Sequence, residues 1–326
     1  MARFFSVVLL ILLLMAAVGG YFLYVPFGPR TETFVELTPG TGTAEIASDL
    51  QARGIVRSRY AFDVLRLMKR GTLKAGEYRF DHPAGAAEVY ARIERGDVYT
   101  VAVTIPEGFN IFDIAQAVEM AKLGGADGFL QAERADTALI EDLSPHARSL
   151  EGFLFPDTYR FSRTATPRQM LSAMVRRFRQ SAGQIGLSAN VEKVVTLASL
   201  VERETGVDRE RPIVASVFEN RLAAGMPLAT DPTVIYAALL ENRYGGKIHV
   251  SDLQSDSAYN TYRHGGLPPG PICNPGMTSL KAAVAPARTD YLYFVSDAKG
   301  HSVFAKSLAE HSENVKAYRQ AENGPR

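Results

Sequence analysis

Val191-Glu-Lys-Val-Val-Thr-Leu-Ala-Ser-Leu-Val-Glu-Arg-Glu-Thr205 has the periodicity of an amphipathic helix, and the predictions for the rest of the chain start from this segment. When each residue advances by about 100°, the apolar side chains fall on one arc. An arc of this length predicts a helix packed inside a domain. Glu202 lies within the same arc, one turn after Ala198. The apolar members are Val191, Val194, Val195, Leu197, Ala198 and Val201.

Glu202 is therefore the first candidate for a catalytic residue. Burial disfavours the charged form of a carboxyl group and raises its pKa. A carboxyl group in that state can hold a proton near neutral pH and donate it, as a general acid must. A glutamate at the rim of an apolar stripe can equally be structural, with its charge met by an arginine. Periodicity leaves both interpretations open.

The composition limits the classes of partner and cofactor. The chain has 326 residues, enough for one large domain or several smaller ones with a sizeable core. Its 36 basic and 35 acidic side chains give a formal net charge of +1, so no overall field is available to hold a nucleic acid. Cys273 is the only cysteine, which excludes an internal disulfide. The histidines lack the spacing of known metal motifs, so we expect no metal and no other cofactor.

The N-terminal segment predicts a membrane anchor. No charged residue occurs between Phe4 and Pro29, and the first part of this segment is almost wholly aliphatic. About 20 apolar residues span a bilayer, and aromatic residues between positions 21 and 24 suit the membrane interface. Arg3 precedes the apolar run, which favours a cytoplasmic N-terminus and an exported soluble part. A signal peptide cleaved near Ala17-Val-Gly19 is the alternative.

A weak internal repeat follows the anchor. Phe34–Gly40 leads into a predicted helix from Thr43, and Val101–Gly108 leads into another from Ile111. Each copy has the pattern of a strand, a Pro-Gly turn and a helix. This pattern resembles a LysM module, a small glycan-binding unit, and an ordinary βα unit is the alternative.

Two further segments are predicted to complete the first module. Lys74–Phe80 has the pattern of a short strand, and Ala86–Glu94 that of the module's second helix.

Three segments carry polar groups of the kind that bind sugars. Asp231-Pro232 predicts a helix start with Asp231 as the cap, and contact with a substrate is the alternative role. Thr233 can present a hydroxyl beside it. Tyr259-Asn-Thr-Tyr262 combines aromatic faces with amide and hydroxyl groups, the mixture that sugars require. Glu151–Tyr159 is predicted to be a rigid loop with an acid among aromatic residues.

Four motifs in a fixed order resemble one known family. They are Ala198-Ser-Leu-Val-Glu202, Asp231-Pro-Thr-Val-Ile-Tyr236, Tyr259-Asn-Thr-Tyr262 and Gly266-Leu-Pro-Pro-Gly-Pro-Ile272. On these motifs the chain resembles the endolytic murein transglycosylase family, also called YceG-like, over nearly its whole length. One departure is that His301 is shifted by one position relative to the family's last strand. A shift of one residue reverses the face of a strand, so we assign no role to His301.

The resemblance implies a single-pass protein of the inner (cytoplasmic) membrane, with its soluble part in the periplasm. Family members combine a LysM-like module with a catalytic domain, cut nascent peptidoglycan within the glycan strand, and work beside peptidoglycan synthases. The family's catalytic glutamate ends the Ala-Ser-Leu-Val-Glu motif, which makes it Glu202 here. We expect the substrate-binding residues to be Glu151, Asp231, Thr233, Tyr259, Asn260 and Thr261.

The implied reaction is lytic transglycosylation of the β-1,4 bond between N-acetylmuramic acid and N-acetylglucosamine. Glu202 would protonate the leaving oxygen and then take the proton of the muramic C6 hydroxyl, leaving a 1,6-anhydro end. Hydrolysis is the close alternative, and it requires a second carboxylate, for which Asp231 and Glu151 are the candidates. A membrane-tethered scaffold that binds peptidoglycan without cleaving it is the alternative from another class.

The predicted fold class is α+β: a transmembrane helix, small LysM-like modules and a mixed helical and β catalytic domain. Helices are expected from Pro167 to about Leu240, followed by a hairpin with its turn at 297–300 and a final helix, Leu308–Arg319. The predicted boundaries are 1–30 for the anchor and linker, 31–100 for the LysM-like module, 101–150 for the second βα unit with connecting helices, and 151–326 for the catalytic domain.

Overall fold

The computed structural model describes residues 1–297 and 300–322, and the chain divides into two compact units, residues 1–101 and 102–326. Both units mix helices with two-stranded antiparallel sheets, which agrees with the predicted α+β class. A further division of the second unit near residue 150 stays a prediction.

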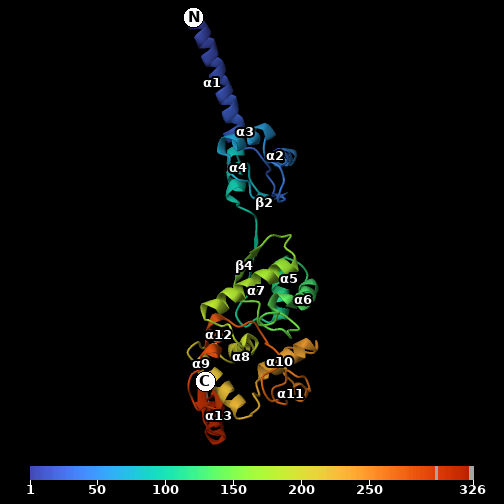
Figure 1. Cartoon of the computed structure of the whole chain (residues 1–326), viewed down its shortest axis with the longest axis vertical. Helices are drawn as coiled ribbons and strands as arrows, with labels where there is room; N and C mark the ends of the chain where they lie inside the picture. The colour runs from blue at the N-terminus through green and yellow to red at the C-terminus, as the bar shows by residue number, and fades with distance from the viewer. Residues whose placement is uncertain (298–299, 323–326) are drawn as a thin grey trace. The chain divides into compact units, whose positions relative to one another are not determined.

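The N-terminal helix α1, Ala2–Tyr24, extends away from the rest of the first unit (Figure 1). Residues 3–24 are long and apolar enough to cross a membrane, and the apolar part is exposed. Only the end of the helix contacts the unit, where Phe22 and Leu23 pack against the core. The rest of the apolar surface is therefore available to a bilayer.

A single core organises the first unit. Strands β1 (Thr33–Leu37) and β2 (Gly76–Phe80) pair antiparallel, and α2 (Thr43–Ala52) and α3 (Arg59–Lys69) connect them. Helix α4, Ala86–Arg95, follows β2 and packs on α1 and α3. Both predicted strands and both predicted helices are thus confirmed. The resemblance to a LysM module stays a prediction.

Helix α3 was absent from the predictions, so Ala86–Arg95 is the third helix of this unit after the anchor and not the second. Its signal in the sequence is the spacing of Ala61, Phe62 and Leu65, whose side chains are all buried. The left-handed residue Arg70 (φ 55°) ends the helix, a position where glycine is usual. Gly71 follows directly, so the chain does carry a stop signal for this helix, and the apolar spacing together with Gly71 could have located it.

The two Pro-Gly turns of the repeat each end on a glycine with positive φ. Gly40 has φ of +88° and Gly108 has φ of +78°, both in the left-handed region that favours glycine. The helix after the second turn, α5 (Ile111–Met120), is capped by Asn110, whose side chain accepts from the N–H groups of Phe112 and Asp113. The turn chemistry of the repeat is therefore confirmed.

The second unit contains most of the helices. In chain order its elements are β3 (Val101–Thr104, beginning at the boundary), α5, α6 (Ala126–Ala135), η1 (Thr137–Ile140), β4 (Thr158–Phe161), α7 (Pro167–Gln184), α8 (Val191–Glu204), α9 (Arg211–Ala223), α10 (Asp231–Leu240), α11 (Val250–Leu253), α12 (Met277–Val284), β5 (Tyr293–Ser296), β6 (Ser302–Ala305) and α13 (Leu308–Glu322). Strand β3 pairs with β4, and β5 with β6. The predicted helices, hairpin and C-terminal helix are confirmed, while Ala298 and Lys299 of the hairpin turn lie outside the described residues.

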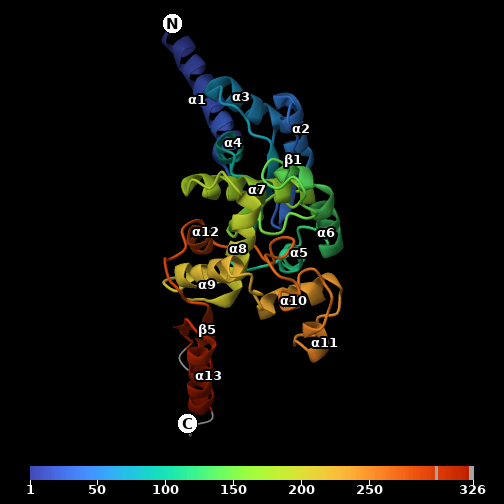
Figure 2. The same cartoon turned by 60° about the horizontal axis from the view of Figure 1, so that its bottom comes forward.

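Helix α8 lies at the centre of this unit, in contact with α9, α10 and α12 (Figure 2). The predicted apolar arc is buried, except that Val194 is half-buried. From residue 195 to 201 every side chain is buried, including the polar Thr196 and Ser199. The Ser199 hydroxyl accepts from the Ile272 N–H at 3.1 Å, so it holds the Pro-Gly loop against the helix.

The prediction of a loop over Glu151–Tyr159 is wrong at its end, because Thr158 and Tyr159 belong to strand β4. Gly152 allows the first part of the loop to approach α8 closely. Its φ is +86°, and an added Cβ would lie 2.5 Å from Pro271 Cγ and 2.8 Å from Val195 Cγ1. A side chain at this position would therefore cost backbone strain and force two packed neighbours apart.

We expect Gly152→Ala to lower the free energy of unfolding by about 2–4 kcal/mol, measured by denaturant unfolding. Gly183→Ala is the matched control, because an added Cβ on α7 meets no atom within 4 Å. That control is expected to be neutral or to stabilise by up to about 1 kcal/mol. Equal stability of the two variants would contradict the packing described for Gly152.

Candidate functional site

The Glu202 carboxyl group is held at the end of α8 by donors from two other segments. Its Oε2 accepts from Arg211 Nη1 at 2.7 Å and from the Gly276 N–H at 2.9 Å. The side chain is only 5% exposed, which confirms that the glutamate lies on the inner face of the helix. Arg211 is the first residue of α9, and Gly276 is the N-cap of α12.

Arg211 makes this arrangement an ion pair withdrawn from water. Its side chain is 6% exposed, and it also donates to the Ser279 hydroxyl and lies 3.1 Å from Asp208. A guanidinium and a backbone N–H on one carboxylate oxygen both stabilise its negative charge. The structural interpretation of Glu202, in which an arginine balances its charge, therefore agrees with the geometry. A catalytic role for Glu202 is compatible with the same geometry.

A second acid, Glu107, lies against the same backbone. An added Cβ on Gly276 would lie 1.9 Å from Glu107 Oε1, so the carboxyl group occupies the space beside this glycine. The adjoining Gly108 faces Glu202, because its added Cβ would lie 3.6 Å from Glu202 Cγ. Its N–H donates to the Asn274 carbonyl at 3.0 Å, which fixes the turn.

Neither Glu107 nor Arg211 was among the sequence candidates. Glu107 lies in the Pro-Gly turn that identified the repeat, and Arg211 at a helix start. The available signal was an acid placed between Pro106 and Gly108, a turn whose conformation fixes its direction.

Glu151 is a buried acid with a strongly altered pKa. Burial raises the pKa of this carboxyl group from its ordinary value of 4.5 to about 8, although the Ile111 N–H works against the rise. That N–H donates to Oε2 at 2.9 Å, and Asn274 Nδ2 donates to Oε1 at 2.8 Å. Glu151 is therefore largely protonated at neutral pH.

A cavity of about 760 Å³ lies on the Glu151 side of the second unit, and Glu202 is not among its lining residues. Tyr236 and Tyr259 form one wall, with ring centroids 5.1 Å apart. Burial raises the pKa of Tyr259 to about 12, so its hydroxyl keeps its proton. Arg134 and Arg148 also line the cavity. Glu192 adds an acid to this lining, so the cavity offers aromatic faces together with charged groups of both signs.

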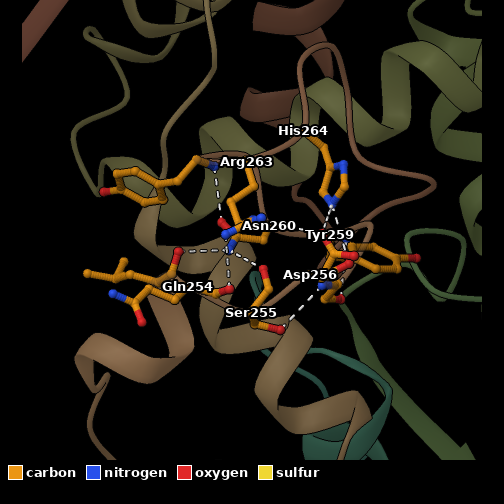
Figure 3. A network of polar contacts seen from close by, with 10 residues as sticks. Gln254, Ser255, Asp256, Tyr259, Asn260, Arg263 and His264 are labelled. Atoms are coloured by element: carbon orange, nitrogen blue, oxygen red, sulfur yellow. Dashed lines mark hydrogen bonds and ion pairs between the residues drawn. The ribbon is translucent and has the colours of Figure 1, made fainter.

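Asn260 is a structural residue of the loop that carries Tyr259 (Figure 3). Its side chain is buried, and Nδ2 donates to the carbonyls of Leu253 and Ser255 at 3.0 and 2.7 Å. Oδ1 accepts from the Tyr262 N–H at 3.1 Å. These bonds use the amide within the protein and fix the direction of Tyr259.

Thr233 and Thr261 are also buried and bonded to one another, with 2.9 Å between their hydroxyl oxygens. Thr261 Oγ1 accepts from the N–H of Thr230, whose own hydroxyl donates to Glu204. Burial raises the pKa of Glu204 above its ordinary value. This cluster joins the start of α10 to the end of α8.

The prediction that Asp231 caps α10 is wrong. Thr230 is the N-cap and Asp231 is the first helical residue, so Asp231 is one position too late to cap the helix with its side chain. Its Oδ1 instead accepts from the Tyr262 hydroxyl at 2.6 Å, and the residue is exposed. An acid in the first turn is still favourable, because the helix dipole is positive there.

The predicted site residues thus fall into three places. Glu202 lies with Arg211 and Glu107, while Glu151 and Tyr259 line the cavity. Around Thr230 lie Asp231, Thr233 and Thr261, and Asn260 supports the neighbouring loop.

The raised pKa of Glu151 predicts a pH-dependent stability. Because the folded protein binds this proton more tightly than the unfolded chain, the free energy of unfolding falls as pH rises from about 4.5 to about 8. Glu151→Gln has no proton to lose, so this part of the fall should disappear when melting temperatures are compared at both ends of the range. The exposed Glu141→Gln should behave as the wild type. An unchanged pH dependence in Glu151→Gln would refute the assignment.

The buried ion pair predicts a coupled loss of stability. Arg211→Gln leaves the Glu202 charge without its partner and should lower the free energy of unfolding by about 3–5 kcal/mol. Arg203→Gln on the exposed face of α8 should cost less than about 0.5 kcal/mol. The double variant with Glu202→Gln should lose less than the sum of the single variants, measured as a double-mutant cycle. Strict additivity would show that the pair is not coupled.

Comparisons with known proteins give one consistent result. The sequence model of the YceG-like family matches residues 35–317. The endolytic murein transglycosylase of Bacillus subtilis (strain 168) is 33% identical over 334 residues, which cover 94% of this chain and 92% of that protein. The protein of the same name from Streptococcus pneumoniae (strain D39) is 29% identical over 359 residues, covering 95% of this chain and 64% of the relative.

A solved structure is also similar. A YceG-like protein from Listeria monocytogenes is 31% identical, with a TM-score of 0.57, and the match covers 87% of this chain and 99% of that one.

Proposed function

The chain belongs to the YceG-like family, and we propose that it is a membrane-anchored lytic transglycosylase that cleaves peptidoglycan within the glycan strand. The bond cleaved would be the β-1,4 bond from N-acetylmuramic acid to N-acetylglucosamine, and the product would carry a 1,6-anhydro end. The observation that carries this proposal is the Glu202 carboxylate, fixed by Arg211 and the Gly276 N–H in a chain similar to two endolytic murein transglycosylases.

The geometry of Glu202 suits proton transfer. The Arg211 guanidinium and the Gly276 N–H both contact Oε2, so Oε1 is the oxygen that can exchange a proton with a sugar. In the mechanism expected from the sequence, Glu202 protonates the leaving oxygen and its carboxylate then removes the proton from the muramic C6 hydroxyl. Arg211 and the Gly276 N–H hold a carboxylate in place, which supports the second of these steps directly.

The cavity offers a place for parts of the substrate away from the cleaved bond. Glu151 and Tyr259 would present a neutral carboxyl group and an aromatic face to it. Asp231 is exposed and can contact a sugar through the oxygen not bonded to Tyr262. For Thr233, Asn260 and Thr261 the proposed role becomes support of these residues, since their polar groups are bonded within the protein.

The first unit would place the enzyme at its substrate. Helix α1 would anchor the chain in the inner membrane with the soluble part in the periplasm, where new strands are made. The small unit built on β1 and β2 would hold a glycan strand in the manner of a LysM module. Peptidoglycan synthases are then the expected neighbours, and cleavage would terminate or trim strands during wall assembly.

The activity test is mass spectrometry of the products of the full-length protein, in detergent, on purified glycan strands. We expect anhydro ends, which are one water lighter than reducing ends, and a loss of more than about 100-fold in rate in Glu202→Gln. Glutamine keeps an oxygen that can accept from Arg211, so the variant should fold at a reduced melting temperature and still bind strands. Reducing ends would indicate hydrolysis, and binding without cleavage would favour the scaffold function.

The anchor test compares the full chain with a variant lacking residues 1–20, which keeps Phe22 and Leu23 packed against the core. We expect the full chain to remain with membranes after high-salt and carbonate washes, because transfer of an apolar helix of this length is not reversed by either treatment. The shortened protein should be recovered in the soluble fraction. Recovery of both proteins in the soluble fraction would exclude α1 as an anchor.

A further inference from the structure

The mechanism expected from the sequence gives Glu202 two tasks that its surroundings do not support equally. A general acid must carry a proton before the reaction starts. The Glu202 carboxylate is instead paired with the buried Arg211, accepts a backbone N–H, and is almost sealed from solvent. These contacts place a cation and an N–H donor on Oε2, so Glu202 acts as a hydrogen-bond acceptor here. The donor of the first proton is therefore to be sought beside Glu202.

Glu107 has the position that such a donor needs. It is an exposed residue, so a substrate can reach it. Both carboxyl groups lie against Gly276. The Glu107 carboxyl group packs beside its Cα, and the Glu202 carboxyl group accepts from its N–H. Proline before it and a left-handed glycine after it fix its direction.

We propose that Glu107 is a second catalytic carboxyl group, which gives the first proton to the substrate while Glu202 acts as the base. This inference rests on the proposed transglycosylase function and deepens it. In the mechanism expected from the family resemblance, Glu202 makes both proton transfers. Here Glu107 makes the first transfer and Glu202 the second.

The charges around Glu107 are consistent with this role. Partial burial raises the pKa of Glu107, and so do the negative charges of Glu202 and Asp208, while Arg211 and the Met277 N–H work in the opposite direction. Arg203 is the other charged group nearby, since its Nη1 would lie 3.8 Å from a Cβ on Gly108. The net effect is a carboxyl group that retains its proton to a higher pH than an isolated glutamate does.

The reaction balances with these two groups and the substrate alone. Glu107 transfers its proton to the glycosidic oxygen as the bond from that oxygen to the muramic C1 breaks. The muramic O6 attacks C1, and its proton passes to the Glu202 carboxylate. Glu107 is then ionised and Glu202 protonated, and a proton returns from Glu202 to Glu107 to complete the cycle. No water is consumed.

The test measures strand cleavage by the full-length protein in detergent and its dependence on pH. Glu107→Gln should lower the rate by about 100-fold or more while strand binding is retained, and Glu107→Asp should recover part of it. The wild-type rate should fall at high pH as Glu107 loses its proton. The residual activity of Glu107→Gln should not show this fall. A purely structural role of Glu107 would lower the rate without changing its dependence on pH.

Two further variants are the controls. Glu141→Gln removes an exposed acid that is not part of this site, so it measures the effect of losing one surface charge and should change the rate less than about fivefold, well below a general acid's contribution. Gly276→Ala keeps the N–H that binds Glu202 but displaces the Glu107 carboxyl group, so it should resemble Glu107→Gln in rate and pH dependence.

The outcomes separate this inference from the function on which it rests. Anhydro products from the wild type, with Glu107→Gln within threefold of the wild-type rate, would overturn the role of Glu107 and leave the transglycosylase function intact. The same holds if Glu107→Gln keeps the fall at high pH. If the wild type forms no anhydro ends, the proposed function itself fails. A loss in Glu107→Gln of the expected size with an altered pH profile supports the inference.

Discussion

The Glu202 carboxylate and the Arg211 guanidinium form an ion pair that is buried, with side chains 5% and 6% exposed. The need to replace water around these two charges determines how the neighbouring helices pack. Moving such charges out of water costs several kcal/mol for each ion unless close partners replace the solvent. The replacements come from the Gly276 N–H, the Ser279 hydroxyl and Asp208. Asp208 lies in the turn before α9, and Gly276 and Ser279 lie at the start of α12, so α8, α9 and α12 must meet within hydrogen-bonding distance of one another.

The same constraint places the small turn at residues 106–108. Gly108 has no side chain, and it faces Glu202 closely while its N–H bonds to Asn274. Asn274 in turn donates to Glu151 and accepts from the Leu154 N–H at 2.8 Å. One buried amide therefore connects the turn beside Glu202 to the acid that lines the cavity. The two carboxyl groups have different partners. Glu202 is paired with the Arg211 guanidinium, whereas Glu151 accepts from neutral donors, the Ile111 N–H and the Asn274 amide.

Several features of the fold were predictable because they follow from local periodicity or turn chemistry. The arc of α8, the turns at Gly40 and Gly108, the strands near residues 34 and 78 and the C-terminal hairpin were all correctly located. Helix α3 was missed although its apolar spacing and Gly71, just after its last turn, were both visible in the sequence. Asp231 was misassigned as a cap because a one-residue change in the helix start changes which side chain can reach the free N–H groups.

The sequence by itself determined which face of α8 is buried, that Glu202 lies on that face, that an apolar helix precedes the soluble part, and which family the motifs resemble. Each of these depends on residues close together in the chain. The tertiary structure alone decided the charge environment of the site. Arg211, Gly276 and Glu107 meet Glu202 across separations of up to about a hundred residues, and periodicity specifies that a side chain is buried but not what it contacts. The chemistry of a buried acid depends on those contacts, because its protonation is set by whichever charges and donors replace water.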